Sequence, residues 1–198
     1  MGVELEVELA ALIRGKQLDR AATRALEAYG AELYGFLVGT LGNEPDAAEV
    51  FSQVGEDLWK GLPSFALGCS VRTWLYVLAR HAAARFRRSP WNRRTGESHL
   101  EALVEAARTR TQPWLRTEVK DRFRALRDAL DPDDRSLLIL RVDRGLAWEE
   151  VARVTLGVEA PDAAVLGRET DRLRKRYQLL KDELRRRADE AGLLDRKG

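Results

Sequence analysis

Residues 46–59 read DAAEVFSQVGEDLW, which is the pattern of an amphipathic helix. At about 100° per residue, the apolar side chains of this segment fall on one arc of a helix and the polar ones fall on the opposite arc. The apolar arc holds Ala47, Val50, Phe51, Val54 and Leu58. The polar arc holds Asp46, Glu49, Gln53, Glu56 and Asp57. We therefore predict a helix that buries one face and presents an acidic face outward.

The same helical periodicity continues outward from this segment in both directions. No stretch alternates apolar and polar residues with an enrichment in β-branched side chains, as an exposed strand does. The sequence thus predicts an all-α fold. The expected helices span residues 5–13, 18–41, 46–60, 71–88, 118–129, 133–143, 147–156 and 162–191. Because aspartate side chains accept hydrogen bonds at helix N-termini, Asp46 and Asp162 are the expected caps of two of these helices.

A polar stretch over residues 91–114 interrupts the helical pattern. It contains Gly96, Pro113 and several Ser and Thr residues, with room for one short helix over residues 99–108. A chain of 198 residues is long enough for two small domains. We predict two helical domains, over residues 1–90 and 116–198, joined by a flexible linker over residues 91–115.

Charge is strongly segregated along the chain, although the formal net charge is only +2. Residues 42–59 hold five acids and no base, whereas residues 71–94 hold seven arginines and no acid. Residues 172–187 hold eight bases and two acids. Such local blocks determine binding more than the total charge does. They favour an acidic face for a protein partner and basic faces for nucleic acid; the alternative for each block is a solvated helix face.

Several classes of function lack their sequence signatures. One cysteine and two histidines are too few for a disulfide framework or a structural zinc site. Gly-rich phosphate loops, HExxH and nucleophile-elbow patterns are missing, so we predict a protein that is not an enzyme and needs no cofactor or metal. No apolar run reaches the roughly 18 residues of a membrane span, and no signal peptide opens the chain. We expect a cytoplasmic protein without membrane insertion.

The predicted helix over residues 71–88 carries the first basic block. One side holds the apolar residues Val71, Trp74, Leu75, Leu78, Ala82 and Phe86, and the other holds Arg72, Tyr76, Arg80 and Arg87. Arginines beside an exposed tyrosine suit a nucleic-acid backbone and a stacked base. The preceding loop, residues 64–70, contains Phe65 and small residues that leave space for a splayed base. Trp74 lies at the margin of the apolar side. Two roles therefore stay open for its side chain, packing in the core and contact with a base.

The C-terminal half contains a helix-turn-helix pattern. An apolar helix ends at Gly145, a second helix begins near Ala147 and contains the small Ala152, and Gly157 supplies a second turn. The long helix that follows has an apolar stripe of Leu166, Thr170, Leu173, Tyr177, Leu180 and Leu184. Arg168, Arg172 and Lys175 point the other way, as a recognition helix presents its N-terminal half to the major groove. The alternative is a plain helical hairpin with a solvated basic face.

Three of these segments, in this order, resemble a bacterial sigma factor of the sigma-70 family, extracytoplasmic-function (ECF) group. They are residues 46–59, residues 71–80 (VRTWLYVLAR) and residues 146–152 (LAWEEVA). They are similar to the family patterns DAEDLVQEVFLRLW, FRAWLYRIAR and LSYEEIA. Ala147 stands where the family has a serine helix cap. The resemblance implies two helical domains, sigma region two and sigma region four, joined by a flexible linker.

The resemblance also implies partners and site residues. Region two would dock on the β′ subunit of core RNA polymerase through Asp46, Glu49, Gln53, Glu56 and Trp59. It would open the promoter −10 element and read it as single-stranded DNA through Phe65, Arg72, Trp74, Tyr76, Arg80 and Arg87. Region four would read the −35 element as duplex DNA through Arg168, Arg172 and Lys175. The expected partners are core RNA polymerase (β′ and β subunits) and promoter DNA, and an anti-sigma factor is common in the family.

Two other classes of function stay open. A stand-alone helix-turn-helix regulator would bind duplex DNA without polymerase, and a helical scaffold would bind no DNA. The acidic face of residues 46–57 favours the sigma factor over the regulator, because a stand-alone regulator has no need of it. The arginine-rich blocks argue against the scaffold.

Overall fold

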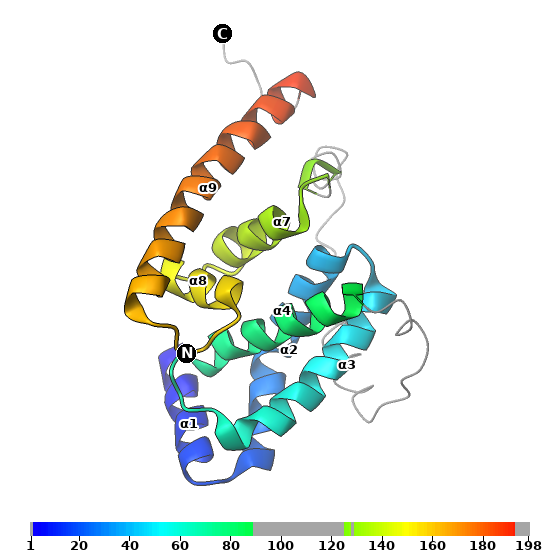
Figure 1. Cartoon of the computed structure of the whole chain (residues 1–198). Helices are drawn as coiled ribbons and strands as arrows, with labels where there is room; N and C mark the ends of the chain where they lie inside the picture. Colours follow the sequence, from blue (N-terminus) through cyan, green and yellow to red (C-terminus); the bar gives the residue numbers. More distant parts are fainter. Residues whose placement is uncertain (1, 89–124, 128, 193–198) are drawn as a thin grey trace.

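The computed structural model describes residues 2–88, 125–127 and 129–192. These residues form helices and connecting turns and contain no β-strand, which confirms the all-α prediction (Figure 1). The helices in chain order are α1 (Gly2–Arg14), α2 (Leu18–Leu41), α3 (Glu44–Gly61), η1 (Leu62–Ser64), α4 (Val71–Arg88), α7 (Pro132–Leu138), η2 (Ile139–Asp143), α8 (Trp148–Leu156) and α9 (Ala163–Glu190). The predicted linker and most of the predicted helix over residues 118–129 lie outside the described residues.

Helices α1 to α4 form a compact N-terminal unit, residues 2–88, in which α2 packs against α3 and α4. The apolar arc predicted for α3 is buried, and each of its five side chains is exposed by 2% or less. Phe51 meets Tyr34 of α2 edge to face, with ring centroids 5.9 Å apart. Gly30 of α2 leaves room for the same ring, because a β-carbon there would lie 3.3 Å from Phe51 Cζ.

The cap of α3 differs from the prediction. Asn43, not Asp46, caps the helix, since its Oδ1 accepts the Asp46 N–H at 2.8 Å. Pro45 fits the first turn because the N–H that proline lacks has no intrahelical partner there. Gly42, with φ of 84°, ends α2 in the left-handed conformation. The turn between α2 and α3 is therefore shorter than the sequence pattern indicated.

The C-terminal unit, residues 129–192, contains the predicted helix-turn-helix. Helix α7 continues into the π-helical turn η2, and Gly157, with φ of 71°, ends α8 as predicted. The Asp162 carboxylate accepts the N–H groups of Ala164 and Val165, which confirms it as the cap of α9. Of the predicted stripe on α9, Leu166, Thr170, Leu173 and Leu180 are buried.

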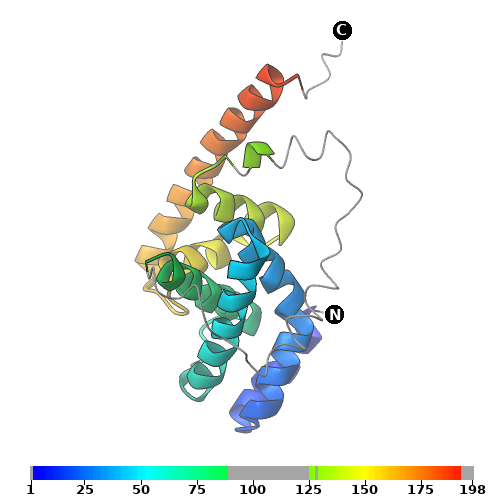
Figure 2. The same ribbon diagram turned by 90° about the vertical axis from the view of Figure 1, so that its right-hand side faces the viewer.

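The two units pack against each other in the structure. Helix α8 lies on α4 and α7 lies on α2, and most core residues of the two units form one continuous cluster, while Leu130, Leu138 and Leu180 form a second, smaller one. Figures 1 and 2 show the C-terminal unit stacked on the N-terminal unit, with α9 extending beyond both. This close packing was not predicted from the sequence.

The buried arc of α3 predicts a contrast between two large side chains of the same helix. Phe51→Ala removes a side chain that is 1% exposed and should lower the free energy of unfolding by about 3–5 kcal/mol. Trp59→Ala, where the side chain is 53% exposed, should change it by less than about 1 kcal/mol. Urea unfolding followed by circular dichroism measures both values. Equal losses would contradict the orientation of α3.

Candidate polymerase and nucleic-acid interface

Phe65 and Trp74 are brought together by the loop between η1 and α4. Their rings stack at a centroid distance of 4.2 Å and an interplanar angle of 7°. Both are buried, with 7% and 6% exposure. Gly61 makes room for the indole, because a β-carbon at Gly61 would lie 2.9 Å from Trp74 Cζ2. Of the two alternatives for Trp74, the structure therefore shows core packing, and Phe65 is its stacking partner.

Tyr76 is not the exposed residue that the sequence predicted. Its side chain is 1% exposed and meets Phe36 of α2 edge to face at 5.3 Å. Burial is the main cause that raises its pKa well above the usual range of tyrosine. The prediction was wrong because helical periodicity treats one side of α4 as exposed, whereas Tyr76 packs on Phe36 of α2, which lies 40 residues away in the sequence.

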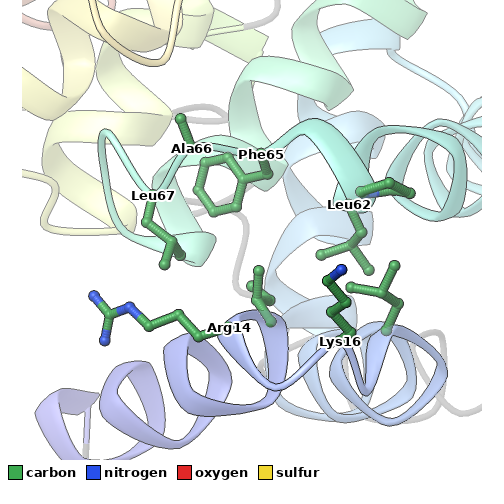
Figure 3. Close-up of a pocket in the computed structure, with 9 residues that line it drawn as sticks. Arg14, Lys16, Leu62, Phe65, Ala66 and Leu67 are labelled. Carbon is green, nitrogen blue, oxygen red and sulfur yellow. The ribbon is translucent and has the colours of Figure 1, made fainter.

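A cavity of about 660 Å³ opens between the loop and the turn that joins α1 to α2 (Figure 3). Phe65, Ala66 and Leu67 line one side of it, and Arg14 and Lys16 lie on the other side. Lys16 and Leu67 both have positive φ, at 55° and 57°. For Lys16 this is the ordinary left-handed end of a helix, because the Gln17 N–H bonds back to the Leu12 carbonyl of α1. The cavity combines an apolar wall with two cationic side chains, a combination that suits a base and its phosphate.

Arg72 is the most highly connected side chain of α4. Its Nε and Nη2 donate to the two carboxylate oxygens of Glu32, at 2.7 and 2.9 Å, and Nη2 also donates to the Arg144 carbonyl at 2.9 Å. The hydrogen bonds to Glu32 raise the pKa of Arg72 above its already high ordinary value. The guanidinium is partly buried and has hydrogen-bond partners in both units, Glu32 of α2 and the Arg144 carbonyl.

Glu6 of α1 supplies the N-terminus of α4 with hydrogen-bond acceptors. Its carboxylate accepts the N–H groups of Val71 and Arg72, at 2.7 and 3.1 Å, and the hydroxyl of Tyr29 at 2.7 Å. The first N–H groups of a helix have no partner within the helix, and a carboxylate there also complements the helix dipole. Sequence reasoning missed Glu6 because 65 residues separate it from Val71. The Arg14-Gly15-Lys16 run is the basic signal in the sequence that marks the cationic side of the cavity.

The other two arginines assigned to this face differ in their surroundings. Arg80 forms an ion pair with Asp133 of the C-terminal unit at 3.2 Å. Arg87 lies exposed near the end of α4. All three arginines therefore lie near the C-terminal unit. Arg72 and Arg80 bind it directly, whereas partial burial lowers the pKa of Arg87 and the charge of Asp133 opposes that shift.

The acidic face of α3 is partly neutralised. Glu56 pairs with Lys60 at 3.1 Å, and Asp57 pairs with Arg85 of α4. Asp46 and Glu49 form no ion pair with any other described residue. Burial, with the charge of Asp46 as a second cause, raises the pKa of Glu49. The surface formed by Asp46, Glu49, Gln53, Glu56 and Trp59 thus concentrates its unpaired charge near the start of α3, with Trp59 53% exposed toward the other end.

The predicted recognition helix presents its basic residues as expected. Arg168 and Lys175 are exposed on α9, and Arg172 is exposed but paired with Glu169 through two hydrogen bonds, at 2.7 and 2.6 Å. That pairing is the first cause of the raised pKa of Arg172. Arg176 anchors the helix to Asp134 of α7, with Nε donating to Oδ1 at 2.7 Å. The three predicted residues lie along one helix without contact to α4.

The hydrogen bonds that Glu6 accepts predict a measurable loss of stability when its carboxylate is replaced. Glu6→Gln removes a charged acceptor from two N–H groups and one hydroxyl, and should lower the free energy of unfolding by about 1.5–3 kcal/mol. Glu4→Gln, on the exposed side of α1, is the matched control and should cost less than about 1 kcal/mol. Urea unfolding measures both, and equal values would contradict the role of Glu6.

Among the described residues, no helix is long and apolar enough to cross a membrane. Nor does any group of three or more His, Cys, Asp and Glu side chains in the described ranges stand close enough to hold a metal ion.

Comparison with known proteins finds a family similarity in the first unit. Residues 25–93 match the family model described as sigma-70 region 2. The matched segment holds most of α2, the acidic face of α3, the loop and the whole of α4. No curated protein matches the chain. The similarity to sigma-70 region 2 therefore covers the acidic face of α3, the loop and α4, and the helix-turn-helix unit lies outside it.

Proposed function

We propose that this protein is a sigma factor of the extracytoplasmic-function group, which binds core RNA polymerase and directs it to promoters. The match of residues 25–93 to sigma-70 region 2 carries the proposal. A helix-turn-helix unit with a basic exposed helix follows the matched segment, in the order that the group requires. The protein acts in the cytoplasm by recognition and has no catalytic activity of its own.

The acidic face of α3 is the proposed contact with the β′ subunit of polymerase. Asp46 and Glu49 supply negative charge that no other described residue pairs, and Trp59 supplies a large exposed apolar side chain. A basic partner surface would gain charge pairing from the acids and apolar burial from the indole. Gln53 and Glu56 complete the proposed contact between these two ends.

The loop and α4 are the proposed reader of the single-stranded −10 element. Phe65, with Trp74 stacked against it, forms one wall of the cavity, and the cavity with Arg14 and Lys16 has the chemistry to hold an unstacked base. Arg72, Arg80 and Arg87 would bind the backbone. Charge and base contact together would offset the few kcal/mol that unstacking a base costs.

Helix α9 is the proposed reader of the duplex −35 element, through Arg168, Arg172 and Lys175. All three side chains are exposed in the N-terminal half of the helix. An anti-sigma factor is a further proposed partner. A stand-alone regulator, the other candidate, would bind duplex DNA tightly and specifically without polymerase.

Reversing the charge at the start of α3 tests polymerase docking. Asp46→Arg with Glu49→Arg should abolish or strongly weaken co-elution with core polymerase, because like charges would then face the basic partner. Glu4→Arg with Asp19→Arg changes the net charge equally at exposed positions of α1 and α2, and should co-elute like the parent chain. If the first variant co-elutes normally, α3 is not the docking face.

Truncating two exposed bases of α9 tests duplex reading. Arg168→Ala with Lys175→Ala should weaken promoter binding by the polymerase complex and lower its salt-dependence slope by about one for each phosphate that is no longer bound. Co-elution with polymerase should be unchanged. Arg186→Ala, near the end of α9 and paired with Glu183 and Glu190, is the matched control. Unchanged promoter affinity of the double variant would remove these residues from the −35 interface.

A further inference from the structure

The pair formed by Glu169 and Arg172 on α9 uses one edge of the guanidinium. Glu169 Oε2 accepts from Arg172 Nε at 2.7 Å, and Oε1 accepts from Nη2 at 2.6 Å. A guanidinium has five N–H donors arranged as a rigid, planar fork. The carboxylate takes two of these donors, and Arg172 Nη1 donates to no other residue that the structure describes. The end of the fork, formed by Nη1 and the second N–H of Nη2, is therefore open to a ligand.

The carboxylate of this pair is held more firmly than the guanidinium. The Glu169 side chain is 12% exposed, whereas that of Arg172 is 62% exposed. Glu169 stands three residues after Leu166 and four residues before Leu173, and both leucines are buried in the core cluster. Residues at these spacings are neighbours on a helix surface, so Glu169 lies at the margin between the buried stripe and the exposed basic face. It is placed as a fixed support from which the arginine extends into solvent.

Two other acid–arginine pairs of the same spacing on α9 are built differently. Arg174 makes one hydrogen bond of 3.3 Å to Asp171, and both side chains are more than half exposed. Arg186 is bound on both edges, because Glu183 takes Nε and Nη2 while Glu190 takes Nη1 at 2.6 Å. The first of these arginines is thus loosely held, and the second has its fork occupied. Of the three pairs, only the one at Glu169 is both firmly held and open at its end.

Glu169 also adds negative charge to a face that the proposed function gives to duplex DNA. Binding to phosphates depends on positive charge, so a carboxylate on this face weakens the attraction. If Arg172 bound a phosphate, the acid beside it would be unfavourable. Recognition of a base edge depends on the direction of the donors, and a fixed guanidinium serves it better than a mobile one. The pairing therefore favours a base as the target of Arg172.

The open end of the fork matches one base in particular. In the major groove, guanine presents two neighbouring acceptors, N7 and O6, whereas adenine presents one acceptor beside a donor. Two N–H groups that point the same way can donate to both acceptors of guanine at once. Arg172 lies in the N-terminal half of α9, the half that a recognition helix presents to the major groove.

We infer that Glu169 is a positioning residue, which holds Arg172 for a two-donor contact with one guanine of the duplex −35 element. This inference rests on the proposed function, because it names a base that the same helix reads. Ordering the guanidinium before DNA arrives lowers the side-chain entropy that binding would otherwise cost. Glu169 thereby strengthens the choice of base although it weakens the attraction for phosphates.

A binding-site selection tests the contact with guanine. Duplexes with a randomised upstream segment are bound to the complex of the full chain with core polymerase, and the bound duplexes are sequenced. The parent complex should enrich a G·C pair, and replacing its guanine should weaken binding by about 5- to 150-fold, the range of a good bidentate contact. Arg172→Lys keeps the charge without the fork and should remove the preference at this position alone.

Glu169→Gln tests the positioning, and Asp171→Asn is the matched control. Each removes one negative charge from the same part of α9, so both should bind a non-specific duplex at least as tightly as the parent. Glu169→Gln should lower the guanine preference at least about twofold, whereas Asp171→Asn should leave it unchanged. In an Arg172→Lys background, Glu169→Gln should have no further effect on the preference, because the two side chains act as one unit. Circular dichroism and co-elution with polymerase check that every variant is folded.

The outcomes separate this inference from the proposed function. A guanine preference that survives Glu169→Gln, or that falls equally in Asp171→Asn, overturns the positioning role. A preference that Arg172→Lys leaves unchanged, or a base other than guanine at the position that depends on Arg172, overturns the contact with guanine. If the parent chain forms no complex with polymerase, or its complex enriches no motif, the proposed function is contradicted and the inference is overturned with it.

Discussion

Arg72 joins the helices of both units at one position. Its guanidinium binds Glu32 of α2 and the carbonyl of Arg144 in the C-terminal unit, while its backbone N–H binds Glu6 of α1. One residue at the start of α4 thereby connects α1, α2 and the C-terminal unit. A partly buried guanidinium is stable only when its donors are satisfied, and Glu32 provides two charge-assisted hydrogen bonds of good geometry. The loop before α4 is positioned by the same cluster.

The structure shows which charges of each block in the sequence are paired and which are exposed. The acidic block on α3 is partly neutralised by Lys60 and Arg85, whereas Asp46 and Glu49 have no ion-pair partner within residues 2–88, 125–127 and 129–192. The basic block on α4 is partly neutralised by acids of the C-terminal unit, such as Asp133. The charges on α9 are paired within the helix, paired with Asp134 of α7 in the case of Arg176, or left exposed. A net charge of +2 is therefore the sum of surfaces with different partners.

Local patterns predicted the helices well and the contacts between distant segments poorly. The bounds of α2 and α4, the buried arc of α3 and the Asp162 cap all follow from periodicity and capping rules that act over a few residues. The burial of Tyr76, the cap from Glu6 and the hydrogen bond from the Thr73 hydroxyl to Glu150 depend on residues tens of positions away. Helical periodicity indicates which side of a helix is apolar, but it does not show whether another unit covers the polar side as well. The polymerase- and DNA-contacting residues stay predictions, because each needs a partner to be tested.

Run-off transcription with core RNA polymerase on genomic DNA, with the start sites mapped, is the decisive measurement for a sigma factor. We predict that adding this protein produces transcripts from a discrete set of start sites, whose upstream DNA shares two short motifs. In the proposed function, α9 reads one of these motifs, and the loop together with α4 reads the other. The proposed function is contradicted if the added protein produces no start sites beyond those of core polymerase alone.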